Sequence, residues 1–212
     1  MKTKVLLFSI VLFLGFKPHA QTMAYDSLMR IAVQELKASS PDKMPELAAR
    51  FERLMLMAPQ EWLPVYYAAY CQTVQSFSLQ DGDAKDNLLN TAQQLIDKAL
   101  ELQPKESELW VLQALVYQGR IMVNPMSRGM KYSQKVYQTL DSAEKMNADN
   151  PRVYYLRGQN LFNTPKMFGG GQEAAKPNLV KAQELFDNQM VKNPLWPEWG
   201  KQDNKQLLSN CK

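Results

Sequence analysis

The side chains that most often carry catalysis or bind metals are scarce in this sequence. The 212 residues include one histidine, His19, and two cysteines, Cys71 and Cys211. Ser-His-Asp and Cys-His mechanisms need a histidine as general base, and protein zinc sites are built mostly from clustered His and Cys. His19 falls in a segment that we expect to be cleaved off, so the mature chain has no histidine. The sequence therefore predicts a protein that is not an enzyme and that carries no metal and no cofactor.

Two further patterns have chemical potential but simpler explanations. Gly169-Gly170-Gly171 precedes a predicted helix, and a helix N-terminus can hold an anion. The Lys-Ser/Thr ending of a phosphate-binding loop is missing and no strand precedes the glycines, so we interpret this run as a flexible turn. Carboxylates near helix starts could form an acid/base pair, but the helix dipole already accounts for them there; they are Glu61, Glu106, Glu108, Glu173 and Glu198.

Aromatic side chains are the best candidates for binding. A tyrosine ring offers a broad apolar face and a hydroxyl group, which suits it to recognition. Adjacent tyrosines cannot point the same way on a helix, so one of each pair is free to face a ligand. Aromatic residues at helical spacing more often belong to the core, and this alternative stays open for each ring. The set is Trp62, Tyr66, Tyr67, Tyr70, Trp110, Tyr117, Tyr154 and Tyr155.

The first 20 residues have the order of a secretory signal peptide. A basic start, Met1 to Lys4, is followed by an apolar run from Val5 to Phe16, which is too short to span a bilayer. We predict cleavage after Ala20, with Ala24 as the alternative and an uncut anchor as the less favoured interpretation. The mature chain, residues 21–212, is then expected in the periplasm or outside the cell, with no insertion into the membrane. Cys71 and Cys211 could form a disulfide there, although buried free thiols are the simpler expectation.

Removal of the signal also changes the charge of the protein. The formal charge of +4 falls to +1, because residues 1–20 contain three lysines and no acidic residue. Nucleic-acid binding depends on a basic surface that displaces counterions from phosphates. The mature chain has no such excess, so a nucleic-acid partner is not expected.

Hydrophobic periodicity predicts helices throughout. Leu47, Phe51, Leu54 and Met55 follow the i, i+4, i+7, i+8 pattern, and no stretch alternates as a strand does. The predicted helices are Tyr25–Ala38, Pro45–Met57, Pro64–Phe77, Ala84–Leu102, Ser107–Val123, Met130–Met146, Arg152–Phe162, Glu173–Val191 and Trp199–Asn210.

Prolines mark a repeat of helix pairs. Pro59, Pro104, Pro151 and Pro194 each follow a helical run, at intervals of 45, 47 and 43 residues. Since proline ends helices, this spacing indicates a helical array. The stretch from Ala92 to Tyr117 resembles the tetratricopeptide (TPR) repeat. It has the small residues of that repeat at Ala92, Ala99 and Ala114, its proline at Pro104, and its large residues at Trp110 and Tyr117. The resemblance extends over about residues 25–195 at the level of helix pairs. It implies an all-α fold, an α-solenoid of about four TPR-like pairs with a C-terminal capping helix.

Two local patterns resemble small secreted TPR-like proteins of Bacteroidetes. They are Trp199-Gly200 with a cysteine near the end of the chain, and Thr164-Pro165-x-x-Phe168 followed by three glycines. The repeats are about ten residues longer than the usual TPR of ~34 residues. We place the surplus in three loops, residues 78–83, 124–129 and 163–171, which would emerge on one rim of the array.

The TPR resemblance implies binding through the concave groove that first helices of pairs line. We predict groove contacts from Tyr67, Tyr70, Tyr155 and Gln159, and rim contacts from Asn124, Arg128, Lys166 and Phe168. The first hypothesis is a non-catalytic exported scaffold that binds a protein or peptide. The alternative is a periplasmic subunit of a transport system that binds a small ligand in an apolar pocket.

Overall fold

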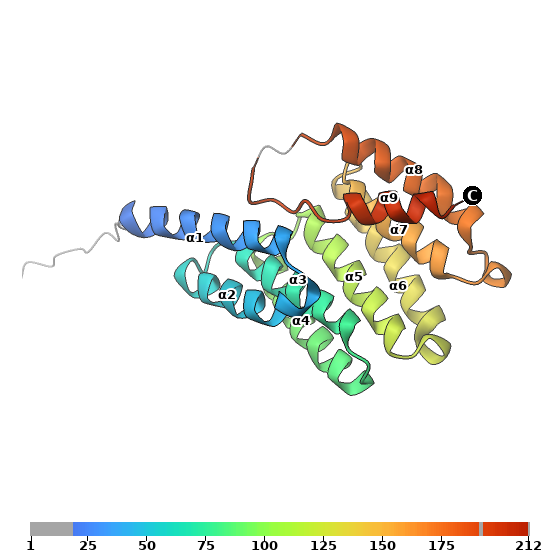
Figure 1. Ribbon diagram of the computed structural model, residues 1–212, viewed down its shortest axis with the longest axis horizontal. Coiled ribbons are helices and arrows are strands. Elements are labelled where there is room, and N and C mark those ends of the chain that lie inside the picture. The colour runs from blue at the N-terminus through green and yellow to red at the C-terminus, as the bar shows by residue number, and fades with distance from the viewer. Residues whose placement is uncertain (1–18, 191–192, 212) are drawn as a thin grey trace, which may run out of the picture.

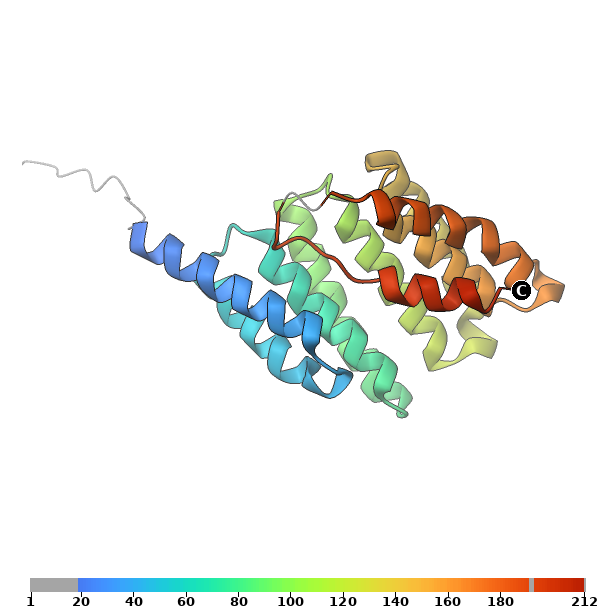
Figure 2. The ribbon, with the colours of Figure 1, turned by 45° about the horizontal axis from the view of Figure 1, so that its top comes forward.

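The computed structural model describes residues 19–190 and 193–211, and within these ranges the chain forms helices and no strand. Consecutive helices pack side by side, and the pairs stack into a curved α-solenoid with α9 lying along its last pair (Figures 1 and 2). The predicted fold class is confirmed. The predicted signal peptide lies outside the described residues except for its last two positions. The helices are α1 (His19–Ala38), α2 (Met44–Met57), α3 (Trp62–Ser78), α4 (Gly82–Leu102), α5 (Ser107–Val123), α6 (Pro125–Met146), α7 (Pro151–Asn163), α8 (Gln172–Asn188) and α9 (Lys201–Ser209), with 3-10 turns η1 (Pro41–Lys43) and η2 (Lys166–Phe168).

Small residues let the helices of a pair approach closely. Ala92 and Ala99 of α4 are fully buried, as their positions in the repeat pattern imply. Gly158 of α7 faces Leu179 of α8 so closely that a Cβ at Gly158 would lie 2.6 Å from the Leu179 side chain. The core therefore consists of aliphatic side chains packed around these small positions, which leaves little room for larger residues.

Most predicted helix boundaries lie within three residues of the observed ones, but two helix starts differ by five or more. Helix α1 begins at His19 instead of Tyr25, and α6 begins at Pro125 instead of Met130. At α6 the Asn124 side chain accepts a hydrogen bond from the Ser127 amide (3.1 Å), and Pro125 occupies the first turn. Asparagine as N-cap followed by proline is a helix start, although we interpreted the pair as a loop.

The predicted rim of three enlarged loops is wrong for the same reason. The connection between α3 and α4 is residues 79–81, and Asn124 alone joins α5 to α6. Of the three predicted loops, only the connection between α7 and α8, residues 164–171, is long. Much of the additional repeat length lies instead in α4 and α6, which have 21 and 22 residues.

The glycine run between α7 and α8 is a tight turn. Gly169 and Gly171 have φ values of 82° and 102°, which favour glycine. A Cβ at Gly170 would lie 2.1 Å from the Thr164 carbonyl oxygen. The Gly170 and Gly171 amides donate to the carbonyls of Pro165 and Leu161, so they are not available to hold a phosphate.

Both cysteines are free and buried in the structure. Burial raises the pKa of the Cys71 thiol to about 12, so this side chain behaves as a small apolar residue. The disulfide considered from the sequence is therefore not formed. Among the helices of residues 19–190 and 193–211, none combines the length and the apolar character that a bilayer span requires.

Candidate ligand-binding groove

The first helices of the pairs together line a groove of about 660 Å³. Helices α1, α3, α5 and α7 contribute most of its apolar side chains, η1 and the start of α2 add Pro41 and Met44, and the start of α9 borders it. Most of the lining residues are aliphatic or aromatic, and the polar ones besides the tyrosines are Lys37, Ser39, Gln159, Glu198 and Asp203. The apolar lining includes Val33, Leu36, Met44, Val74, Phe77 and Leu115.

Residues 193–200, which we call the strap, close one side of this groove. The strap runs from the side of α1 and α3 to the start of α9 (Figure 1). Arg152 holds it by donating to the carbonyl oxygens of Pro197 (2.8 Å) and Trp199 (3.2 Å). The Tyr67 hydroxyl donates to the Leu195 carbonyl (2.7 Å), so α3 and α7 both anchor the strap.

Gly200 allows the chain to turn from the strap into α9 where it packs against two aromatic rings. Its φ is 96°, and a Cβ there would lie 3.2 Å from both the Tyr155 and Phe186 rings. A larger residue would be strained at this φ and crowded by the rings.

Four aromatic side chains, Tyr67, Tyr70, Tyr155 and Trp199, form the inner wall, and Tyr66 lies behind them. The rings of Tyr70 and Tyr155 flank Trp199, with centroid distances of 5.4 and 6.4 Å, and the Trp199 indole donates to the Tyr66 hydroxyl (2.7 Å). Tyr67 and Tyr155 are 3% and 5% exposed, so both rings belong to the core and also border the groove. Burial raises the pKa of Tyr67, Tyr70 and Tyr155 well above the ordinary tyrosine value. These hydroxyls therefore stay neutral at physiological pH.

Polar groups lie at the solvent edge of the groove. Lys37 of α1 pairs with Glu198 of the strap, with 2.7 Å between Nζ and Oε1. Asp203 of α9 is exposed and also lines the groove, and the Gln159 amide donates to the Tyr155 hydroxyl (3.1 Å). The site thus combines an apolar interior with a charged edge.

The structure places the predicted site residues in two separate regions. Tyr67, Tyr70, Tyr155 and Gln159 all line the groove. Their role in binding stays a prediction.

None of the four rim residues lines the groove. Asn124 caps α6, and Arg128 lies within α6 instead of in a loop, where it pairs with Asp86 of α4 (2.8 Å). Lys166 and Phe168 lie in η2 and are exposed.

The sequence interpretation missed the strap and its contribution to the site. We placed Trp199 inside the last helix, but α9 begins at Lys201 and Trp199 belongs to the strap. The sequence does contain evidence for this segment. Helix-breaking residues that lie this close together indicate an irregular connection, and here they are Pro194, Pro197 and Gly200. Lys37 and Glu198 meet across 161 positions of the sequence, a separation that no local pattern reveals.

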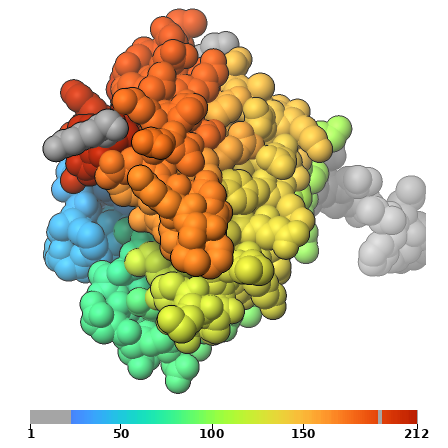
Figure 3. All heavy atoms as spheres, turned by 90° about the vertical axis from the view of Figure 1, so that its right-hand side faces the viewer, coloured from blue at the N-terminus to red at the C-terminus, as the bar shows by residue number. Residues whose placement is uncertain are grey.

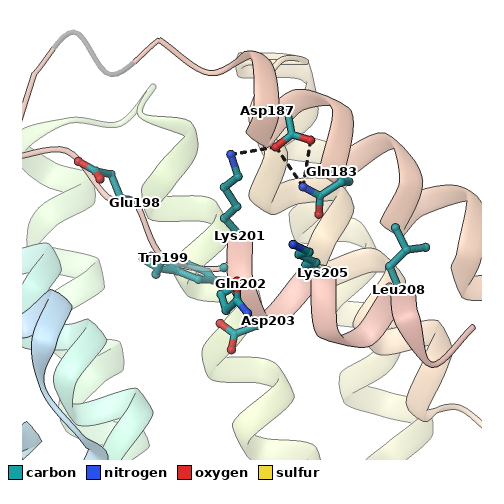
Figure 4. A pocket seen from close by; sticks show the side chains of 10 residues that line it. Gln183, Asp187, Glu198, Trp199, Lys201, Gln202, Asp203, Lys205 and Leu208 are labelled. Carbon is teal, nitrogen blue, oxygen red and sulfur yellow. Dashed lines mark hydrogen bonds and ion pairs between the residues drawn. The ribbon is translucent and has the colours of Figure 1, made fainter.

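A second hollow lies between α8 and α9 and has a volume of about 760 Å³. Its lining is largely charged or polar, and the Lys201 side chain extends toward Asp187 of α8 (Figure 4). In the described ranges, no three His, Cys, Asp or Glu side chains gather as a metal site would require. The groove gathers three tyrosine rings and the Trp199 ring from α3, α7 and the strap, so we take it as the candidate binding site.

Comparison with known proteins identifies relatives with this architecture. The HusA haemophore from Porphyromonas gingivalis is 33% identical in sequence, with a TM-score of 0.83 over 91% of this chain and 94% of that one. A TPR protein from Thermus thermophilus has a TM-score of 0.63 at 18% identity, over 88% of this chain and 80% of that one, and this likeness concerns the fold alone. No protein-family model and no curated protein matches the chain. The identity and mutual coverage with the haemophore show that the chain belongs to the same protein family as HusA.

Proposed function

We propose that this protein is an exported haemophore-like carrier that holds a haem-type tetrapyrrole in the aromatic groove. The relative's name denotes a haemophore, and neither relative is named as an enzyme. The observation that carries the proposal is the groove itself, about 660 Å³ in volume and lined by the first helices and the strap. Export follows from the signal peptide that residues 1–20 predict.

A tetrapyrrole matches the chemistry of this groove. Its macrocycle is flat and largely apolar, and stacks well on aromatic rings. The half-buried lining residues Tyr70, Val74, Phe77 and Trp199 supply such surface, and Tyr67 and Tyr155 pack behind them. The volume falls within the range of roughly 300–1,000 Å³ that is usual for ligand sites.

The groove offers the iron of haem no strong protein ligand. The mature chain has no histidine, and tyrosine ligates iron as a phenolate, which burial disfavours at Tyr67, Tyr70 and Tyr155. Met44 supplies a thioether, a weak donor. The proposed recognition therefore depends on the faces of the macrocycle.

Filling the groove tests the proposal. Val74 is half-buried and lines the groove, so Val74→Trp should occupy ligand space and reduce haem affinity by at least tenfold. Val180→Trp is the matched control, because Val180 is 40% exposed on α8 and does not line the groove. Affinity is measured by haem absorbance and quenching of tryptophan fluorescence. Equal haem binding by both variants, or none by the unmodified protein, would overturn the proposal.

A protein or peptide partner is the second candidate function. Exposed apolar side chains favour it: Met126 of α6 is 99% exposed, and Met167 and Phe168 of η2 are 82% and 65% exposed. The start of α6 and the connection between α7 and α8, which carry them, lie on the same side of the array, the face shown in Figure 3. The double substitution Met167→Ser and Phe168→Ser should lower the affinity for such a partner and leave the affinity for haem unchanged.

A further inference from the structure

We propose that Lys37 receives a peripheral carboxylate of the ligand, and that Glu198 occupies this lysine in the ligand-free protein. The groove would thereby select flat apolar ligands that carry carboxylate groups over their uncharged analogues. This inference rests on the proposed function, because it concerns the same groove.

Lys37 is the one basic side chain among the described residues that line the groove. The other charged side chains there, Glu198 and Asp203, are acidic. An anionic group of a ligand is repelled by these two carboxylates and can form an ion pair only with Lys37. Lys201 lies nearby but pairs with Asp187 (2.9 Å) and extends toward α8, away from Glu198 (Figure 4).

The Lys37–Glu198 pair is positioned for exchange. Its side chains are 40% and 36% exposed, and exposed ion pairs contribute little net stability. A ligand carboxylate brought to the groove edge by its buried macrocycle competes at high effective concentration. When a ligand carboxylate takes the place of Glu198 in the ion pair with Lys37, the fold therefore loses little stability.

The backbone of the strap is fixed by contacts that do not involve Lys37. Arg152 holds the carbonyls of Pro197 and Trp199, and Tyr67 holds that of Leu195. The exchange thus needs only side-chain rotation of Lys37 and Glu198. Glu198 therefore competes with the ligand carboxylate for Lys37 while the backbone of the strap stays in place. This competition sets how strongly the groove prefers carboxylate-bearing ligands, and the groove need not open.

The experiment measures the affinities of protoporphyrin IX and of its dimethyl ester by tryptophan quenching, at the same pH and ionic strength. The full mature protein is compared with Lys37→Met, Glu198→Gln and the double variant. Lys98→Met, an exposed lysine of α4 outside the groove, is the matched control.

We expect the unmodified protein and Lys98→Met to bind the diacid several-fold more tightly than the ester. Lys37→Met should remove this preference. Glu198→Gln should enlarge it, and this gain should vanish in the double variant, which separates competition for Lys37 from a general effect of charge. A diacid preference that survives Lys37→Met, equal binding of the two ligands by the unmodified protein, or a Glu198→Gln gain that persists without Lys37 would each overturn the inference. If the ester binds well without any preference, only this inference fails; if neither porphyrin binds, the proposed function fails with it.

Discussion

Arg152 of α7 and Glu108 of α5 form a buried ion pair beneath the strap. The guanidinium Nη2 lies 2.8 Å from the carboxylate, and the two side chains are 1% and 4% exposed. Asn150 also donates to Glu108 (2.8 Å), and Arg152 packs over the Trp199 ring. The pair thus joins two helix pairs to the segment that closes the groove.

Removing one partner of this ion pair should destabilise the protein strongly. Arg152→Met leaves the Glu108 charge buried without its main partner and frees two strap carbonyls, with an expected loss of about 3–5 kcal/mol. Arg157→Met on the same helix is the control: Arg157 pairs with Asp141 and Glu144 but is 17% exposed, and we expect a loss of about 1 kcal/mol or less. Denaturant unfolding measures both. Similar losses would contradict the role of Arg152 as the anchor of the strap.

Metal-free protoporphyrin IX should bind about as tightly as haem, within a few-fold. The groove lacks histidine and its tyrosines stay neutral, so iron adds no strong bond. Parallel titrations with the two porphyrins check this. Affinity for haem more than about a hundredfold above that for the metal-free ring would instead indicate axial ligation, and Met44→Leu would then locate the ligand.

Stability should fall at alkaline pH because the groove tyrosines are buried. The pKa of Tyr67, Tyr70 and Tyr155 is raised above the ordinary value of 10.0 in the folded state. Unfolding then releases protons above about pH 10, so the stabilisation is complete below that pH and is lost as pH rises through it. Phenolate absorbance of the native protein should lag behind that of the chain unfolded in guanidinium. Coincident titration curves would show that these hydroxyls are exposed.

Two glycine substitutions should have opposite effects on stability. Gly158→Ala places a Cβ 2.6 Å from the Leu179 side chain and 3.3 Å from its backbone nitrogen, which should cost about 1–3 kcal/mol. Gly129→Ala in α6 meets nothing within 4 Å and should stabilise the helix by up to about 1 kcal/mol. Thermal unfolding of the two variants compares them directly. A neutral Gly158→Ala would mean that α7 and α8 pack less closely than described.

The sequence predicted the repeat architecture because helix pairing depends on local patterns. Proline spacing and the small residues Ala92 and Ala99 report contacts between neighbours in sequence, and α-solenoids are built from such contacts. The placement of Tyr67 and Tyr155 on the groove followed from helical geometry and the TPR resemblance. Loop lengths were predicted poorly, since Asn124-Pro125 can both end one helix and begin the next.

The strap could not be placed from the sequence because its partners are distant. Trp199 meets Tyr66, and Glu198 meets Lys37, across more than a hundred positions. Glu108 was interpreted as a carboxylate favoured by the helix dipole, but it is the buried partner of Arg152. Such pairs depend on the curvature of the complete array, which local periodicity does not specify.

The most direct test of ligand binding in the groove is NMR of the tryptophan indole groups during titration with protoporphyrin IX. Trp199 lines the groove, whereas Trp110 and Trp196 do not. We predict saturable binding of one porphyrin per chain, with a large shift of the Trp199 indole signal and little change at Trp110 and Trp196. Absence of saturation, or shifts confined to Trp110 or Trp196, would contradict a tetrapyrrole site in this groove.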